Sequence, residues 1–269
     1  MSLLQGAVLS QVPGNEGWPD DACLYQPFED HQILLNENAP CLAVQVYIHM
    51  CGLDVKVIYR TNAEFMSPTR KLPLLRCGNL VISEPTAIIG LLKQRGYALG
   101  GDFSESQQHD MKAYIELVNN VLVPAELFVT WMDDRTYKES TCKRYGSPYS
   151  WPLNTILCWI KRKEVMHYLD AVGWKKGKKT ITSLEDDVQR CCSALSEKLG
   201  EKEYFLGNQP TELDALVFGH LFTILTTRLP DNRLAETVRK FDNLVAFCRN
   251  IDKNFFVQDD SNEISTTDE

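Results

Sequence analysis

The sequence predicts an α/β domain followed by an all-helical domain. Short strand-like segments, in which apolar residues cluster or alternate, occur only in the first 95 residues, where they are interleaved with helical patterns. Beyond residue 103, apolar residues recur at the spacing of amphipathic helices. A segment with three glycines, residues 95–103, separates the two patterns and is typical of a linker.

The boundaries follow from these patterns and from the composition of the chain ends. Residues 258–269 contain five acidic residues and no basic residue, a composition typical of disordered tails. We predict a loose N-terminus at 1–20, an α/β domain at 21–95, a linker at 96–103, a helical domain at 104–256 and an acidic disordered tail at 257–269.

The first half begins with a β-α-β pattern. A short strand is predicted at 23–26 and an alternating strand at 55–59. Between them, the apolar residues of 42–53 share one face of a helix, with Asn38 as a possible cap and Pro40 in its first turn. Two strands joined through a helix predict a parallel pair with a right-handed crossover.

A hairpin and a second helix complete this half. Strands are predicted at 71–75 and 79–83 and a helix at 86–94. Pro73 has no backbone N–H, so it fits only at the first residue of its strand, where a cis peptide bond would be a deliberate feature. The order β-α-β-β-β-α predicts a thioredoxin-like layout, a mixed four-strand sheet with helices on both faces.

The helical half is organised around residues 211–227. This segment is apolar on nearly every face, which predicts a helix buried on all sides. Thr211 is placed as its N-cap, and the Asp214 carboxylate can accept from the Thr211 N–H in a capping-box geometry. The other helices are predicted at 111–129, with a kink at Pro124, and at 153–169, 184–199 and 232–256.

Composition limits the function classes. A net charge of −8 makes a nucleic-acid backbone a poor partner. No segment approaches the about 20 apolar residues of a membrane span. No Lys or Arg precedes Lys56, so we expect no secretory signal or mitochondrial presequence. The nine cysteines show neither C-x-x-C nor zinc-site spacing, which predicts reduced thiols and no metal or cofactor.

Several segments carry a resemblance to known proteins. An α/β half with a proline at its third strand, joined to a helical half with a buried T-x-x-D helix, resembles the glutathione-transferase architecture. Within it, the strings NAEFMSP, ELVNN, YGSPYSWPLN and PTELDALVFGHLFTILTT resemble the metaxin family. The likeness runs from about residue 18 to residue 256 in the same order and spacing.

This resemblance implies a location and a role. Metaxins are transferase-like proteins on the cytosolic face of the mitochondrial outer membrane. The likeness implies a non-enzymatic scaffold subunit without its own anchor, held peripherally by metaxin-1. It implies attachment to the outer-membrane β-barrel of the sorting and assembly machinery, a part in β-barrel protein import and assembly, and an indirect link to the cristae-organising complex of the inner membrane.

The residues of a glutathione site are incomplete. Such a site requires a nucleophile, a backbone contact from the residue before the third-strand proline, here Leu72, and an acidic residue followed by serine. Here Glu84 is followed by Pro85, which has neither a hydroxyl nor an N–H. The departure argues against glutathione binding, and Glu84 could instead cap the following helix.

One enzymatic alternative stays open at this point. Cys41 follows Pro40 near a predicted helix N-terminus, where the helix dipole favours a thiolate. A glutathione-dependent transferase or thiol reductase could use this thiol. The other interpretation is a small buried core cysteine. A third possibility for the chain is a cytosolic transferase-like binding module without mitochondrial partners.

The remaining features are candidates for contacts. Tyr145, Tyr149 and Trp151 give the loop 145–152 the composition of a partner interface, although the loop could also pack on its own domain. Four lysines within 175–179 could meet anionic lipid head groups or form a solvated turn. We expect His220 to be a hydrogen-bonded core residue rather than a catalyst.

Overall fold

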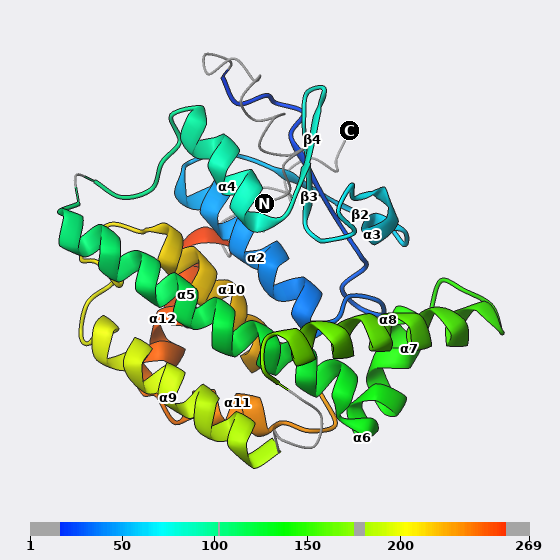
Figure 1. Cartoon of the computed structure of the whole chain (residues 1–269). Helices are drawn as coiled ribbons and strands as arrows, with labels where there is room; N and C mark the ends of the chain where they lie inside the picture. The colour runs from blue at the N-terminus through cyan, green and yellow to red at the C-terminus, as the bar shows by residue number, and fades with distance from the viewer. Residues whose placement is uncertain (1–16, 102, 175–180, 257–269) are drawn as a thin grey trace, which may run out of the picture.

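The computed structural model describes residues 17–101, 103–174 and 181–256. The acidic tail at 257–269, most of the N-terminal segment at 1–20 and the lysines of 175–179 lie outside these residues. An α/β half and a helical half pack side by side, with α2 and α10 between them (Figure 1).

The sheet has the predicted mixed topology, in the strand order β2-β1-β3-β4. Strand β1 pairs in parallel with β2 and antiparallel with β3, and β3 pairs antiparallel with β4. Pro73 lies just before β3 and follows a cis peptide bond, so its missing N–H costs the sheet no hydrogen bond. The strands are β1 (Cys23–Gln26), β2 (Lys56–Tyr59), β3 (Leu74–Cys77) and β4 (Leu80–Ser83).

The helices and helical turns account for the rest of the fold. In the α/β half they are α2 (Leu35–Met50), α3 (Ala63–Met66) and α4 (Pro85–Gln94). In the helical half they are α5 (Glu105–Leu127), the π-helical η1 (Phe128–Met132), α6 (Asp134–Thr136), the π-helical η2 (Tyr137–Thr141), α7 (Cys142–Tyr145), α8 (Leu153–Ala171), α9 (Ile181–Leu199), α10 (Glu212–Thr226), α11 (Arg233–Arg239) and α12 (Asp242–Phe255).

Helix α2 begins earlier than the sequence predicts. Leu34 is extended and precedes the first helical residue, and the carboxylate of Glu37 accepts its N–H at 3.1 Å. The acidic residue thereby satisfies an amide at the helix start. The expectation that Asn38 caps this helix is therefore wrong, and Pro40 lies inside the helix rather than in its first turn.

The predicted helix at 232–256 is in fact two helices. Phe241, with φ −112° and ψ 88°, leaves the helical conformation between α11 and α12. Its carbonyl then accepts from the N–H groups of Leu244 and Val245, which begins the second helix. Apolar periodicity continues across this break, because both helices bury a face in the same core, so the pattern alone predicts one element.

The expectation that no segment approaches the composition of a membrane span is wrong for α5 with η1. Residues Glu105–Met132 are long and apolar enough by composition to cross a membrane, but half of the apolar window is buried within the fold. The helix packs against α2, α9 and α10. We therefore assign it as a core helix of the folded chain.

Helix α10 lies at the centre of the helical half, and Asp214 holds its start. One carboxylate oxygen of Asp214 accepts from the N–H of Thr211 at 2.8 Å and from the Thr211 hydroxyl at 2.5 Å. The other oxygen accepts from the N–H of Phe205 at 2.8 Å. Burial raises the pKa of Asp214 to about 6, and these hydrogen bonds oppose the rise.

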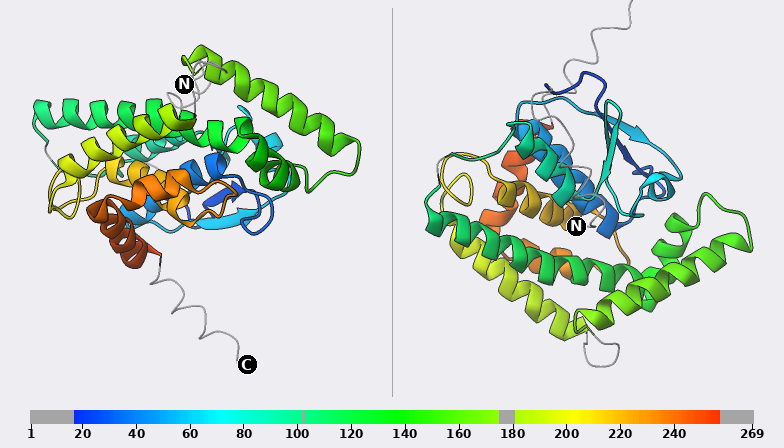
Figure 2. Two further views of the ribbon diagram at one scale, coloured as in Figure 1. Left: turned by 90° about the horizontal axis from the view of Figure 1, so that it is seen from below. Right: turned by 45° about the horizontal axis from the view of Figure 1, so that its top comes forward.

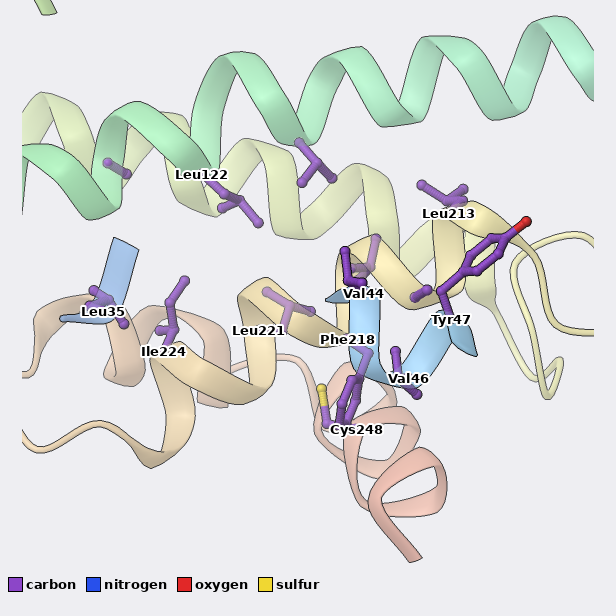
Figure 3. Close-up of a cluster of buried hydrophobic side chains, with 14 of the residues drawn as sticks. Leu35, Val44, Val46, Tyr47, Leu122, Leu213, Phe218, Leu221, Ile224 and Cys248 are labelled. Carbon is purple, nitrogen blue, oxygen red and sulfur yellow. The ribbon is translucent and has the colours of Figure 1, made fainter. Parts of the chain in front are cut away.

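The two halves meet where α10 crosses α2. A methyl group on Gly219 of α10 would lie 2.5 Å from the carbonyl oxygen of Ala39 and 2.7 Å from the Cβ of Ala43. Around this close approach, side chains of α2, α5 and α10, among them Val44 and Leu122, enter one shared core (Figure 3). Small residues at the crossing therefore set the distance between the halves.

We expect Gly219→Ala to lower the free energy of unfolding by about 1–3 kcal/mol, because the added methyl group overlaps the α2 backbone. Gly90→Ala is the matched control, since Gly90 is also helical but has no neighbouring atom within 4 Å of an added Cβ. That change should be neutral or stabilising by up to about 1 kcal/mol. Urea unfolding of both variants measures the difference, and equal stabilities would contradict the close crossing.

Candidate functional site

A cleft with a volume of about 420 Å³ opens between the two halves. Helices α2, α4, α5, α8 and α10 contribute its walls, which makes it a product of the interdomain packing. A volume of this order is sufficient for a small-molecule ligand. Its apolar lining comprises Pro40, Ala43, Leu72, Pro85, Ile89, Ile115, Val123, Leu127, Val165 and Leu216.

A charged cluster lies at the border of this cleft. The carboxylate of Glu64, on α3, accepts from the Lys161 ammonium at 2.6 Å and from the Tyr145 hydroxyl at 3.1 Å. Both side chains of the ion pair are largely buried. Because Tyr145 ends α7 and Lys161 lies on α8, the cluster ties this part of the helical half to the α/β half.

Arg144 reinforces the same connection. Its guanidinium donates to the backbone carbonyls of Ile33 at 2.9 Å, Asp30 at 3.2 Å and Glu29 at 2.5 Å. The planar guanidinium can satisfy three carbonyls of one loop at once. The loop before α2 is thereby fixed against α7.

Glu37 is the most unusual titratable group on the cleft wall. Burial of its carboxyl group raises its pKa to about 7, and the nearby Glu64 carboxylate adds to the rise. The hydrogen bond from the Leu34 N–H and the charges of Lys161 and Arg144 oppose it. Glu37 therefore changes its protonation near neutral pH.

A second pair lies deeper, between α5 and α10. A ring nitrogen of His220 lies 2.7 Å from a carboxylate oxygen of Glu126, and both side chains are almost completely buried. Burial raises the pKa of Glu126, and the interaction with His220 opposes the rise. His220 is thus a hydrogen-bonded core residue, as the sequence suggested, although it also borders the cleft.

The positions of a transferase glutathione site also lie on this cleft. Leu72, Glu84 and Pro85 all line it. Glu84 precedes α4 with φ at +76°, and its carboxylate pairs with Lys71 at 3.0 Å instead of accepting an N–H of α4. The expected side-chain cap is therefore wrong, and the first residue of α4 is a proline that offers no N–H to a ligand.

Cys41 does not occupy the position that its proposed chemistry requires. It is fully buried and is the seventh residue of α2, beyond the free amides of the first turn. Burial, with the Glu37 and Glu29 carboxylates, raises the pKa of its thiol well above the usual range. Its buried neighbours are Ile33, Ala63 and Leu72, so the structure favours the core interpretation.

The aromatic loop is divided between internal and external contacts. Tyr145 packs edge-on against Trp131 and hydrogen-bonds Glu64, and Tyr149 packs edge-on against Phe65 of α3. Trp151, in contrast, is 81% exposed. Of the three aromatic contact candidates, the two tyrosines are engaged within the chain and Trp151 is available.

The charged cluster was not found by sequence analysis. Glu37, Glu64, Arg144 and Lys161 come from four separate helices and share no spacing. One available signal was Glu37, an acidic residue placed to accept an amide at the start of α2. The positions of Glu64, Arg144 and Lys161 relative to Glu37 depend on tertiary packing.

Comparisons with known proteins agree with this architecture. A family model described as "Outer mitochondrial membrane transport complex protein" matches residues 41–162, and a model described as "Glutathione S-transferase, C-terminal domain" matches residues 188–251. Among solved structures, a β-etherase from Sphingobium is 13% identical with a TM-score of 0.60 and covers 88% of this chain and 99% of its own. The apo form of glutathione S-transferase III is 14% identical with a TM-score of 0.52 and covers 86% and 91%. At these identities the likeness shows a glutathione-transferase-like fold.

Several proteins share a higher sequence identity with this chain than these solved structures do. Human Metaxin-2 is 50% identical over 95% of this chain and 97% of its own length. A Metaxin-2 homolog of Caenorhabditis elegans is 37% identical over 78% of this chain and 90% of its own. Mouse Metaxin-1 is 32% identical over 81% of this chain and 70% of its own.

We expect Glu37→Gln to change the pH dependence of stability. The folded protein holds the Glu37 proton more tightly than the unfolded chain, so the wild-type should lose stability relative to the variant as pH rises from about 4.5 to about 7. The difference in unfolding free energy should change by on the order of 1–3 kcal/mol. Glutamine can still accept the Leu34 N–H.

Urea unfolding across this pH interval measures the effect. Glu116→Gln, which alters an exposed residue of α5, should leave the unfolding free energy close to that of the wild-type. A wild-type and Glu37→Gln pair with parallel pH profiles would contradict the raised pKa.

Proposed function

This chain belongs to the metaxin family, and from this relationship we propose that it acts as a non-enzymatic scaffold subunit in protein import at the mitochondrial outer membrane. The observation that carries the proposal is the 50% identity to human Metaxin-2 over 95% of the chain. The match of residues 41–162 to the outer-membrane transport family supports the same membrane.

The more specific parts of the proposal come from the family resemblance. The subunit would lie on the cytosolic face, held by metaxin-1. It would attach to the outer-membrane β-barrel of the sorting and assembly machinery and support the import and assembly of β-barrel proteins. Through that assembly it would contribute to intermembrane bridging, with an indirect link to the cristae-organising complex of the inner membrane.

The chemistry of the cleft supports a non-enzymatic role. The Glu84 carboxylate is paired with Lys71 and is followed by Pro85, which has no hydroxyl or N–H for a glutathione carboxylate. Cys41, the proposed nucleophile of the alternative enzyme, is fully buried with a raised thiol pKa. A neutral, inaccessible thiol is a poor nucleophile.

Trp151 is the best candidate for contact with metaxin-1. Its side chain is exposed, while Tyr145 and Tyr149 anchor its loop to α3. A large aromatic side chain presented by an anchored loop loses little conformational entropy on binding, which is typical of interface hot spots. The surface that metaxin-1 would contact is therefore centred on this side chain.

We expect Trp151→Ala to weaken co-purification with metaxin-1 by about 30-fold or more in dissociation constant, because truncating a hot-spot tryptophan costs about 2 kcal/mol or more. The thermal unfolding of the isolated chain should not change, since the side chain is exposed. Trp159→Ala, which truncates another exposed tryptophan, should leave metaxin-1 binding intact. Unchanged binding of Trp151→Ala, or loss of its fold, would contradict the assignment.

A further inference from the structure

The outward face of α8 is apolar although no described residue covers it. Leu153, Ile156, Trp159 and Ile160 are each about half exposed. The opposite face of the same helix buries Cys158 and Val165 in the protein. Large apolar side chains that gather on the exposed face of one helix are typical of an interaction surface.

This apolar stripe lies away from the cleft. The side chains of α8 that line the cleft are Lys161, Glu164, Val165 and Tyr168, which lie on a different face of the helix. Figure 2 shows α8 at the outer edge of the molecule in both views. The stripe is thus accessible to a large, flat partner.

Exposed lysines occur in the sequence around the stripe, although the chain has a net charge of −8. Lys138, Lys143 and Lys163 are exposed. The other basic residues of 138–163 are engaged within the fold: Lys161 pairs with Glu64, Arg162 pairs with Asp134, and Arg144 donates to backbone carbonyls. Lys163 continues the stripe, with its ammonium 4.0 Å from the centre of the Trp159 ring. A tryptophan beside a lysine at the edge of an apolar face is typical of helices that lie in a membrane interface.

We propose that the outward face of α8 inserts directly into the interfacial region of an anionic lipid bilayer. The exposed lysines of this stretch are attracted by anionic head groups, while Leu153, Ile156, Trp159 and Ile160 enter the acyl boundary. The inference rests on the proposed outer-membrane location for the identity of the membrane, and it adds a direct lipid contact to attachment through metaxin-1.

The size of the stripe favours lipid over a protein partner. The stripe consists of four apolar side chains over about 10 Å of helix. A stable protein interface takes about 20–30 residues from each partner. Insertion into lipid requires no complementary shape. Trp151, which precedes the helix, is not needed for this contact and remains available to metaxin-1.

The test is co-sedimentation of the full chain with phosphatidylcholine vesicles that contain about 20 mol% phosphatidylinositol. We expect binding that weakens at high salt and on pure phosphatidylcholine. The double variant Ile156→Thr/Ile160→Thr should bind about tenfold less, because it removes apolar groups from the inserted face. Brominated lipids should quench tryptophan fluorescence in the wild-type, and Trp159→Phe should remove most of this quenching.

A matched control separates this effect from a general loss of exposed apolar surface. Val81→Thr/Val172→Thr alters two exposed valines, on β4 and at the end of α8, outside the stripe, and should bind vesicles like the wild-type. Absence of vesicle binding by the wild-type, or equal binding by both double variants, would overturn the proposal.

Metaxin-1 co-purification distinguishes this proposal from the proposed function. If Ile156→Thr/Ile160→Thr binds metaxin-1 normally but not vesicles, the stripe is a lipid contact. If it loses metaxin-1 and keeps its vesicle binding, the stripe is a protein interface and the lipid proposal is overturned. Failure of the wild-type to bind metaxin-1 would contradict the proposed partner. The vesicle assay would still test the lipid contact of α8.

Discussion

The crossing of α10 over α2 is the contact on which the rest of the structure depends. Gly219 allows the α10 backbone to lie against Ala39 and Ala43, and the side chains around it form one core shared by both halves. Asp214 anchors the start of the same helix by holding Thr211 and Phe205. The cleft between the two halves depends on this fixed arrangement.

The fold around the cleft is transferase-like, whereas the side chains of the cleft are not those expected of a glutathione site. A glutathione-transferase-like fold places a helix start and the loop before β3 around the cleft, but the side chains there differ from the glutathione site that the resemblance implies. Glu84 pairs with Lys71, Pro85 has no N–H to donate, and Cys41 is enclosed by apolar neighbours. Folds host many functions, so the function must be argued from these residues.

The sequence predicted the structure best where a single residue, or the spacing of apolar residues along one segment, determined the local conformation. The apolar helix around residue 218, the parallel β1–β2 pair, the β3–β4 hairpin and the place of Pro73 beside the start of β3 followed from local pattern and backbone chemistry. The start of α2 was missed because Glu37, rather than Asn38, satisfies a helix amide. The Glu64–Lys161 pair and the exposed face of α8 depend on which surfaces meet in space, and periodicity does not specify this.

The most direct test of a scaffold role is isothermal titration calorimetry of the full chain with glutathione. A cleft without a donor at Pro85 or a reactive thiol at Cys41 should give no saturable heat up to millimolar concentrations, which corresponds to less than about 4 kcal/mol of binding free energy. Saturable binding that is lost in Cys41→Ala would contradict the account, because it would show a working glutathione site in the cleft.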